Sequence, residues 1–353
     1  MKWIFHQTAR LLTTVILSGS ICFGGISNVA IAQTTGRWRV VGGDQDLSRY
    51  GAKMVTTLTA IDGILYAGTD DGVYDLEKGT WHPVGKSGGF NTYELLNAYG
   101  TLFGAFASNG TLFARFVSSG VGVFDKGKWY QVGKSEIPNI YKIAVLGHTL
   151  YAGAASGIYS LENNGTWRIF GGSSSPQLSS VGFLANVGGT LYADGNMPYA
   201  DGNGNRKKIE NGLVMYRKGT WQPVGTLVSE NALVRNGVNA LVRYGRTLYA
   251  ATDAGVYTYS QRVSHSSSAV SWILSGLKNA GPVNALLVMH GVLFAGTENG
   301  VYSLTAGSWH RVGADILDPE AGGPAPSLIS TLYGTGQTLY AAGVNVYSFH
   351  VGW

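Results

Sequence analysis

The chain has 353 residues, a formal net charge of +5, 13% charged residues, 52 glycines and one cysteine. Its high apolar and glycine content excludes a disordered chain and fits short strands joined by tight turns. The small charge excess makes no case for nucleic acid as a partner. A single cysteine cannot form an internal disulfide or a thiolate metal site.

Residues 1–32 are predicted to be a secretory signal peptide that does not belong to the fold. Positive charges at Lys2 and Arg10 precede a long apolar run, which ends in the small-x-small sequence AIA. An uncleaved anchor is the alternative, because the run is nearly long enough to span a bilayer. Cleavage after Ala32 would also remove Cys22 and would make the protein secreted or held at the cell surface.

Four short apolar runs, separated by glycine-containing turns, recur along the rest of the chain. The copy at 283–313 shows them as VNALLVM, VLFAGT, GVYSL and SWHRV. In each copy an aromatic residue marks the second run, with Leu or Ile eight residues before it and Ala or Gly one residue after it. These aromatic residues are Tyr66, Phe103, Tyr151, Tyr192, Tyr249, Phe294 and Tyr340. Repeats of about 40 to 50 residues with four strands each predict an all-β, seven-bladed β-propeller at residues 33–353.

Tryptophan marks the fourth run of the repeat. The members of this column are Trp38, Trp81, Trp129, Trp167, Trp221, Trp272, Trp309 and Trp353. Its recurrence is better explained by packing between blades than by lectin activity. The segment 36–42 is a fourth run without the preceding three, while the last repeat stops at Trp353. We therefore predict that this N-terminal strand closes the last blade and removes its exposed sheet edge.

Two repeats carry extra residues. Aligned on Phe103 and Tyr192, both insertions fall between the second and third strands. The turns after the second and fourth strands of a meander emerge on the same face, so the long loops should gather there. Loops on a rigid scaffold commonly carry binding sites, so this loop-rich face is the expected binding face.

The fourth-repeat insertion contains the sequence DGNGNRKKIENG. Asp201, Asn203 and Asn205 alternate as in calcium-binding loops, but an EF-hand loop needs Gly at its sixth and Glu at its twelfth position. Arg206 and Gly212 stand at those positions. A flexible polar loop is favoured over a calcium site, and no metal ligand is assigned. Its basic residues could also lie on an anionic polymer or membrane surface.

The segment 65–85, LYAGTDDGVYDLEKGTWHPVG, resembles the repeats of bacterial secreted β-propellers. The spacing of Tyr74 and Trp81 is similar to that of kelch repeats, although the kelch double glycine is missing. The segment also resembles the Asp-box (BNR) repeats of sialidase-like propellers, without their leading Ser-x-Asp. The resemblance implies the architecture only, because propellers include hydrolases, lyases, lectins and protein-docking modules.

The first strands of the blades should line the mouth of a central channel. The residues ten positions before the aromatic column are Thr56, Tyr93, Tyr141, Gly182, Asn239, Asn284 and Ser330. Tyr and Asn offer flat apolar faces and hydrogen-bonding tips to a carbohydrate or another polar ligand. With the adjacent charged residues, the predicted ligand-binding set is Tyr93, Glu94, Tyr141, Lys142, Asn239 and Asn284. Bonds among these side chains or to channel water are the alternative.

Acidic and arginine residues on the loop-rich face raise the possibility of catalysis. Glycoside hydrolysis needs two facing carboxylates, and the sialidase resemblance suggests an arginine cluster that holds the substrate's carboxylate. The candidates are Asp70, Asp71, Asp253, Glu298, Asp315, Asp318 and Glu320, with Arg49, Arg235 and Arg243. Acidic residues are common in turns, which explains the acidic candidates, and arginines are common on protein surfaces, which explains the arginine candidates. No catalytic residue is therefore assigned. Nucleotide-, zinc- and hydrolase-type motifs are missing from the sequence, so no cofactor is expected.

The sequence therefore predicts a secreted, monomeric, non-enzymatic β-propeller. Its expected ligand is a carbohydrate, a cell-surface polymer or a protein partner, with no nucleic acid and no transmembrane segment after signal cleavage. An extracellular glycoside hydrolase or lyase is the alternative. A purely structural or sensory role is a third interpretation.

Overall fold

A computed structural model describes residues 36–42, 47–85, 92–98, 111–116, 120–125, 128–133, 137, 139–171, 178–200, 206–224, 237–259, 272–313 and 328–352. The chain divides into two compact units, Met1–Ile31 and Ala32–Trp353, and every described residue belongs to the second. The predicted signal peptide lies outside the described residues. None of the helical segments in these ranges has the length and apolar character needed to span a bilayer.

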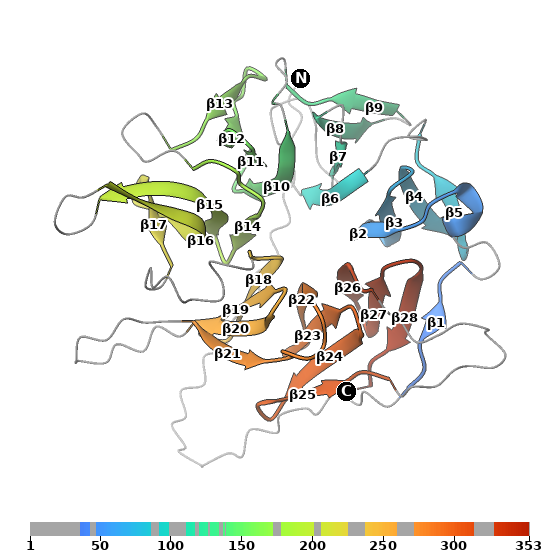
Figure 1. The fold of residues 1–353 in the computed structure, drawn as a ribbon. Coiled ribbons are helices and arrows are strands. Elements are labelled where there is room, and N and C mark those ends of the chain that lie inside the picture. The colour runs from blue at the N-terminus through green and yellow to red at the C-terminus, as the bar shows by residue number, and fades with distance from the viewer. Residues whose placement is uncertain are drawn as a thin grey trace, which may run out of the picture. The chain divides into compact units, whose positions relative to one another are not determined.

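The strands form antiparallel sheets of four strands each, seven in the described residues (Figure 1). Sheet 1 contains β2 (Val55–Ile61), β3 (Ile64–Thr69), β4 (Val73–Glu77) and β5 (Thr80–Pro83). Sheet 2 contains β6 (Thr92–Ala98), β7 (Thr111–Phe116), β8 (Gly120–Asp125) and β9 (Lys128–Gln131). Sheet 3 contains β10 (Ile140–Leu146), β11 (Thr149–Ala154), β12 (Gly157–Leu161) and β13 (Trp167–Ile169). Sheet 4 contains β14 (Leu184–Val187), β15 (Thr190–Ala200), β16 (Arg206–Arg217) and β17 (Thr220–Pro223).

The remaining sheets complete the set. Sheet 5 contains β18 (Ala240–Tyr244), β19 (Thr247–Thr252), β20 (Gly255–Tyr259) and β21 (Ile273–Gly276). Sheet 6 contains β22 (Val283–Met289), β23 (Val292–Thr297), β24 (Gly300–Thr305) and β25 (Ser308–Arg311). Sheet 7 contains β26 (Thr331–Thr335), β27 (Thr338–Ala342), β28 (Val346–His350) and β1 (Arg39–Val40). A short 3₁₀ helix, η1 (Leu47–Tyr50), follows β1.

The first strands of successive sheets contact one another in a closed cycle. The order is β2, β6, β10, β14, β18, β22 and β26, and β26 contacts β2 again. These strands surround a common centre in Figure 1, with the later strands of each sheet further out. The predicted all-β propeller of four-stranded antiparallel blades is confirmed.

The first and the last strand of the described chain meet in sheet 7. Six sheets consist of four consecutive strands, whereas sheet 7 joins β26, β27 and β28 to the N-terminal β1. β1 pairs antiparallel with β28, with Arg39 opposite Ser348. The Trp38 ring lies 5.1 Å from that of Phe349, and its indole N–H donates to the carbonyl of Val312 in the neighbouring sheet at 2.9 Å. The predicted closing strand is confirmed, while Trp353 lies outside the described residues.

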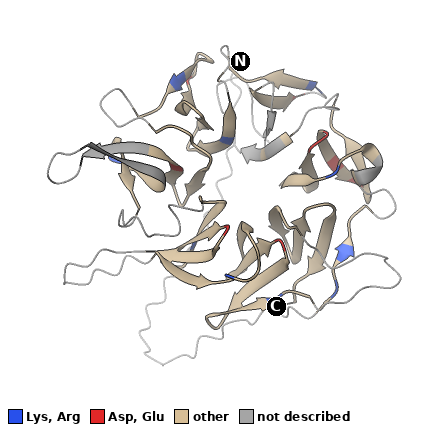
Figure 2. Ribbon diagram, in the orientation of Figure 1, with Lys and Arg blue, Asp and Glu red and all other residues tan. Residues whose placement is uncertain are grey.

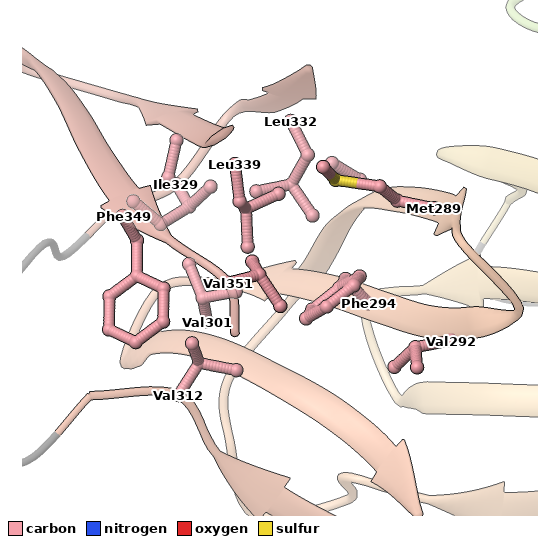
Figure 3. Packing of buried hydrophobic residues seen from close by; sticks show 12 residues of the cluster. Met289, Val292, Phe294, Val301, Val312, Ile329, Leu332, Leu339, Phe349 and Val351 are labelled. Atoms are coloured by element: carbon pink, nitrogen blue, oxygen red, sulfur yellow. The ribbon is translucent and has the colours of Figure 1, made fainter. Parts of the chain in front are cut away.

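The hydrophobic core lies between neighbouring sheets. β23 is buried at all six positions, because its two faces contact different sheets. Figure 3 shows Phe294 of this strand beside Val351, which follows β28, and Leu339 and Phe349 of sheet 7 belong to the same cluster. Gly296 keeps the approach close, since a Cβ there would lie 2.6 Å from a methyl carbon of Ile329. This packing explains the nearly continuous apolar runs of the second strands.

Tryptophans link five of the seven fourth strands to the preceding sheet. The indole N–H donates to the carbonyl of the valine that follows the neighbouring fourth strand. Five such bonds, at 2.9 to 3.2 Å, join Trp38 to Val312, Trp81 to Val41, Trp129 to Val84, Trp167 to Val132 and Trp272 to Val224. The prediction that the tryptophan column packs between blades is confirmed.

The structure corrects the alignment of the second repeat. In sheet 2 Ala114 lies opposite Leu95, as Ala67 lies opposite Leu58 in sheet 1. Phe113 therefore holds the aromatic position that the sequence assigned to Phe103. The extra residues separate the first and second strands, not the second and third. The sequence misleads here because TLF occurs twice, ten residues apart.

The insertion in the fourth repeat does lie between the second and third strands, as predicted. It forms a long β-hairpin in which Met197 lies opposite Ile209 and Ala200 lies opposite Arg206. Arg206 and Gly212 are therefore strand residues of β16, so the expected polar or calcium-binding loop is wrong for this part of the insertion. Residues 201–205 lie outside the described residues.

Candidate functional site

Three of the acidic candidates, Asp70, Asp253 and Glu298, lie in turns that share the sequence Thr-(Asp or Glu)-x-Gly. These turns form a structural motif. The threonines Thr69, Thr252 and Thr297 are fully buried. Each hydroxyl donates to the carbonyl of the glycine three residues later, at 2.9 to 3.0 Å. It also accepts the N–H two residues later at 3.1 Å. The hydroxyl thus satisfies the backbone of the turn.

The neighbouring carboxylates also bind the scaffold. One Asp70 oxygen accepts the N–H groups of Lys53 and Met54 at 2.8 and 3.1 Å. Asp253 accepts from the amide of Asn239 at 2.8 Å. These contacts favour the structural interpretation over a catalytic one. Three further acidic candidates, Asp315, Asp318 and Glu320, lie outside the described residues.

The predicted channel-mouth position coincides with a β-bulge. The pairing of the first and second strands shifts by one residue at Thr56, Tyr93, Tyr141 and Asn284. A bulge leaves one residue unpaired and changes the direction of its side chain. The residues at this position are therefore turned out of the regular ladder at the start of each first strand.

In four sheets the side chain at this position donates to the backbone of the next sheet. Thr56 donates to Thr92, Asn239 to Val283 at 3.1 Å, Asn284 to Ile329 at 2.9 Å, and Ser330 to Val55. Each accepting carbonyl belongs to the residue just before the equivalent position in that sheet. The amides of Asn239 and Asn284 are thus bound to the backbone of the next sheet, whereas the alternative interpretation of the sequence considered only bonds among these side chains or to channel water.

Among the described side chains of the remaining sheets, those of sheets 3 and 4 do not show this arrangement. Tyr141 in sheet 3 is 43% exposed, and Gly182 in sheet 4 has no side chain. Tyr93 and Glu94 lie in β6, but their side chains are outside the described residues. The register places Glu94 directly opposite Arg115 of β7. Sheets 3 and 4 therefore differ from sheets 1, 5, 6 and 7 at the channel mouth.

Asp194 holds the corresponding place in sheet 4. It is 8% exposed, and its Oδ1 accepts the N–H of Phe183 at 2.6 Å. The backbone of Gly182 and of Val238 in sheet 5 also donates to this carboxylate. Burial raises the pKa of Asp194 to about 6, although these bonds and the charge of Lys142 oppose the rise.

The sequence contains a signal for Asp194, which is not among the predicted residues. The residue after the small one in the second strand is Gly68, Gly153, Ala251, Gly296 and Ala342 in the other aligned repeats. Asp194 stands alone among them, and the corrected alignment adds Arg115 to the same column. This departure from a column of small residues is the signal by which Asp194 can be found in the sequence.

A cavity of about 210 Å³ lies at the centre of the first strands. Its described lining is Thr56, Thr57, Lys142, Ala240, Asn284, Ala285, Leu286, Ser330, Thr331 and Leu332. Of the predicted residues, Lys142 and Asn284 line the cavity. Tyr141 directly precedes Lys142 in the sequence, and Asn239 directly precedes the lining residue Ala240. Lys142 is the one charged residue among the described lining. Figure 2 shows that most of the described ribbon is uncharged.

The arginine candidates do not form a cluster in the described residues. Arg243 lies further along β18, with its guanidinium 3.5 Å from the Tyr192 hydroxyl. It is close to Gly188, in the turn after β14. That turn belongs to the face opposite the channel mouth. The side chain of Arg49 and all of Arg235 lie outside the described residues, and no group of three potential metal ligands occurs in the ranges described.

No protein-family model matches the sequence, and no curated protein matches it. Solved structures with the same architecture include the extracellular domain of BT4673 from B. thetaiotaomicron, a putative hybrid two-component system. It matches with a TM-score of 0.65 and 14% identity, and the match covers 84% of this chain and 38% of that chain. PorZ, a surface component of the type-IX secretion system of Porphyromonas gingivalis, matches with a TM-score of 0.53 and 13% identity over 89% of this chain and 38% of that chain.

The WD40 β-propeller domain of Doa1 matches with a TM-score of 0.56 and 12% identity over 89% of this chain and 96% of that chain. The chain thus spans about two fifths of the length of the BT4673 and PorZ chains. At these identities the likeness concerns the fold alone. The chain is similar to β-propeller domains that include extracellular domains of bacterial surface proteins.

Proposed function

We propose that residues 33–353 are a secreted or cell-surface β-propeller that binds a carbohydrate at the channel mouth without converting it. The observation that carries this proposal is the polar central cavity beside an exposed tyrosine. Hydroxyl and amide groups from Thr56, Asn284 and Ser330 line the cavity, and Tyr141 lies at the bulge next to its wall. Sugar rings combine hydroxyl groups with apolar faces, so this combination suits them.

The cavity size limits what can enter it. Its volume of about 210 Å³ is below the roughly 300 Å³ at which typical small-molecule sites begin. It would therefore take one sugar ring, while the rest of a glycan lay on the loop-rich face. We propose that the protein acts as a monomer.

Two further observations support an extracellular role. The sequence carries the features of a signal peptide with cleavage after Ala32. Similar solved structures include extracellular domains of bacterial surface proteins. A cell-surface polymer would use the same site through one of its sugar units, whereas a protein partner would contact the longer loops of this face.

A carbohydrate-active enzyme is the second candidate, and Asp194 is the observation in its favour. A carboxyl with a pKa of about 6 is suited to general acid catalysis near neutral pH. However, its carboxylate accepts three backbone N–H groups, which is the environment of a structural acid. Hydrolysis would need a second carboxylate, and the described cavity lining contains none.

The test is a glycan array on residues 33–353, followed by turnover assays on every glycan that binds. We expect binding with the glycan recovered intact. Tyr141→Ala should weaken binding by about tenfold, because an aromatic contact of about 1.5 kcal/mol is lost. Tyr130→Ala is the matched control, since Tyr130 is 46% exposed but lies in the outer strand β9. Equal effects of the two substitutions, or no glycan bound, would contradict the proposal.

A further inference from the structure

We propose that sheet 3 carries a second sugar-binding site on the face opposite the channel mouth, and that this site takes a neutral oligosaccharide. A cavity of about 520 Å³ lies there. Its lining comes from the start of β11, the end of β12 and the turn that follows β12. Turns before second strands and after third strands emerge opposite the channel mouth. The cavity shares no lining residue with the central one, so the inference goes beyond the proposed function.

The floor of this cavity is fixed by packing between sheets 3 and 4. Tyr151 of β11 lies directly opposite Ser160 of β12, and Thr149 shares their face of the sheet by strand alternation. The Tyr151 ring lies 4.8 Å from that of Phe170, which lies 4.5 Å from that of Tyr216 in sheet 4. The two hydroxyl-bearing residues of the floor are therefore held by an aromatic cluster.

The repeat itself does not create this cavity. In sheet 6 the positions of Tyr151 and Ser160 are held by Phe294 and Ser303. These two residues are 0% and 1% exposed, so the same place is closed there. The opening in sheet 3 is a departure from the common pattern.

The turn that forms the rim is also specific to sheet 3. The facing residues Leu161 and Trp167 are six positions apart, whereas the equivalent pairs of sheets 1, 2, 4 and 6 are five apart. The longer turn is internally bonded: the Glu162 N–H donates to the Thr166 carbonyl at 3.0 Å, and the Thr166 N–H donates to Asn164 Oδ1 at 2.9 Å. A rim held in this way costs little ordering on binding.

The charge of the wall favours a neutral ligand. Glu162 is the one charged residue among the described residues that line this cavity. Its Oε2 lies 2.9 Å from the Nε of Arg168, so an adjacent cation compensates its charge. Burial raises the pKa of Tyr151 above its ordinary value, and its hydroxyl therefore keeps its proton at neutral pH.

The remaining chemistry of the wall suits a sugar. Its neutral polar groups are three hydroxyls and two amides, those of Thr149, Tyr151, Ser160, Asn163 and Asn164. Hydroxyls and amides both donate and accept, as the hydroxyl groups of a sugar do. Leu161, the one aliphatic residue of the described lining, is 4% exposed, so the apolar side chains of a peptide would find little surface.

The size of the cavity indicates more than one sugar ring. Its volume of about 520 Å³ lies within the range of roughly 300 to 1,000 Å³ that is typical of small-molecule sites. The central cavity has about 210 Å³. If that volume takes one ring, the cavity of sheet 3 has room for two linked rings.

The experiment is an array of neutral disaccharides and trisaccharides, probed with residues 33–353 and with the variants Tyr141→Ala and Asn163→Ala. We expect at least one glycan to stay bound in Tyr141→Ala, because the second site does not include Tyr141. Titration with that glycan should show about tenfold weaker binding to Asn163→Ala, through loss of the amide's hydrogen bonds. Added salt should leave the affinity unchanged, because the ligand is neutral.

Two further variants serve as control and as a test of ligand class. Asn299→Ala is the matched control, because Asn299 is an exposed turn asparagine that lines neither cavity. It should bind like the parent protein. Glu162→Gln keeps an acceptor oxygen and removes the charge, so the affinity for a neutral sugar should change by less than about threefold. Circular dichroism melting curves establish that each variant is folded.

The outcomes separate this inference from the proposed function. Loss of all glycan binding in Tyr141→Ala, or equal effects of Asn163→Ala and Asn299→Ala, would overturn the second site and leave the channel-mouth site standing. Tighter binding of glucosamine than of glucose, abolished by Glu162→Gln, would overturn the neutral class of ligand. Binding that depends on Asn163 and is unaffected by Tyr141→Ala on every glycan would support the second site and contradict the channel-mouth site. Absence of binding by the whole array would overturn both.

Discussion

Equivalent residues around the channel mouth have different roles in different sheets. Asn284 occupies a bulge and donates to the next sheet at 2.9 Å. Tyr141 occupies the equivalent bulge of sheet 3 but is 43% exposed. In sheet 4 the linking role passes to Asp194, which accepts from the backbone of both sheet 4 and sheet 5. The same register position therefore joins neighbouring sheets in some blades and presents a partly exposed side chain to solvent in another.

Ionisation of Asp194 should lower the stability of the fold. Its pKa rises from 3.8 to about 6 on folding, mainly through burial, so the folded state binds more protons than the unfolded state between these values. The free energy of unfolding should therefore fall as pH rises from 4 to 7, by up to about 3 kcal/mol from this group. The measurement is urea unfolding of residues 33–353 at both pH values.

Asp194→Asn isolates this contribution, because the variant keeps the shape but does not titrate. The loss of stability between pH 4 and 7 should be larger in the parent protein than in the variant. Subtracting the two series cancels the effects of the other carboxyl groups. If the parent protein instead gained stability relative to the variant over this interval, the buried carboxyl would be stabilised in its charged form.

The sequence predicted the ring of channel-mouth residues but not their bonding. The ten-residue offset from the aromatic column is visible in one dimension, so Thr56, Asn239, Asn284 and Ser330 could be identified. Whether an amide binds a neighbouring sheet or a ligand depends on where the next strand places its carbonyl. The distance between the amide and that carbonyl is set by the packing of neighbouring sheets, which the repeat pattern does not encode.

The fourth strands depend on their tryptophans to join neighbouring sheets. Trp272 donates to the Val224 carbonyl at 3.0 Å. Trp309 holds the equivalent position in sheet 6, but its Nε1 is buried with no hydrogen-bond partner among the described residues. A buried donor without a partner carries a desolvation cost of about 1 to 3 kcal/mol. The two sheets thus differ in one bond at the same place.

Replacing each of these tryptophans by phenylalanine should reveal that bond. Trp272→Phe leaves a buried carbonyl unpaired, whereas Trp309→Phe removes a donor that was already unpaired. Both variants lose the same volume, so Trp272→Phe should be the less stable by about 2 kcal/mol. Urea unfolding of the two variants measures the difference. Equal losses would mean that volume alone determines the contribution of the column.

Element boundaries could be predicted where the repeat is regular and not where it is duplicated or extended. β22 to β25 follow the apolar runs of the sequence closely. In sheet 2 two TLF segments compete for one strand, and only pairing of Ala114 with Leu95 selects the second. In sheet 4 the polar composition of 206–212 suggests a loop, but pairing with β15 keeps it in a strand. Tertiary pairing overrides local composition in both cases.

The closed ring depends on the short β1 strand. Removing residues 33–40 should expose the edge of β28 and remove the packing of Trp38 against Phe349. We expect the truncated protein to lose about 3 to 5 kcal/mol, as for deletion of a large core side chain, and to self-associate through the free edge. Thermal melting and light scattering measure the two effects.

Addition of a peptide with the sequence of 33–42 provides the control. It should restore part of the melting temperature in a concentration-dependent manner, because it binds the folded state alone. A scrambled peptide of the same composition should have no effect. A truncated protein that melted like the parent would show that β1 is not needed for closure.

The pairing of β1 with β28 in sheet 7 also constrains when the ring can close during biosynthesis. The ribosome makes β1 first, yet its partner β28 is made last, and Trp38 reaches the Val312 carbonyl across 274 positions of sequence. The opening segment must therefore wait without a hydrogen-bonded neighbour while all the intervening strands are produced. We therefore expect the ring to close late in folding, because β1 can pair with β28 only after synthesis has passed His350.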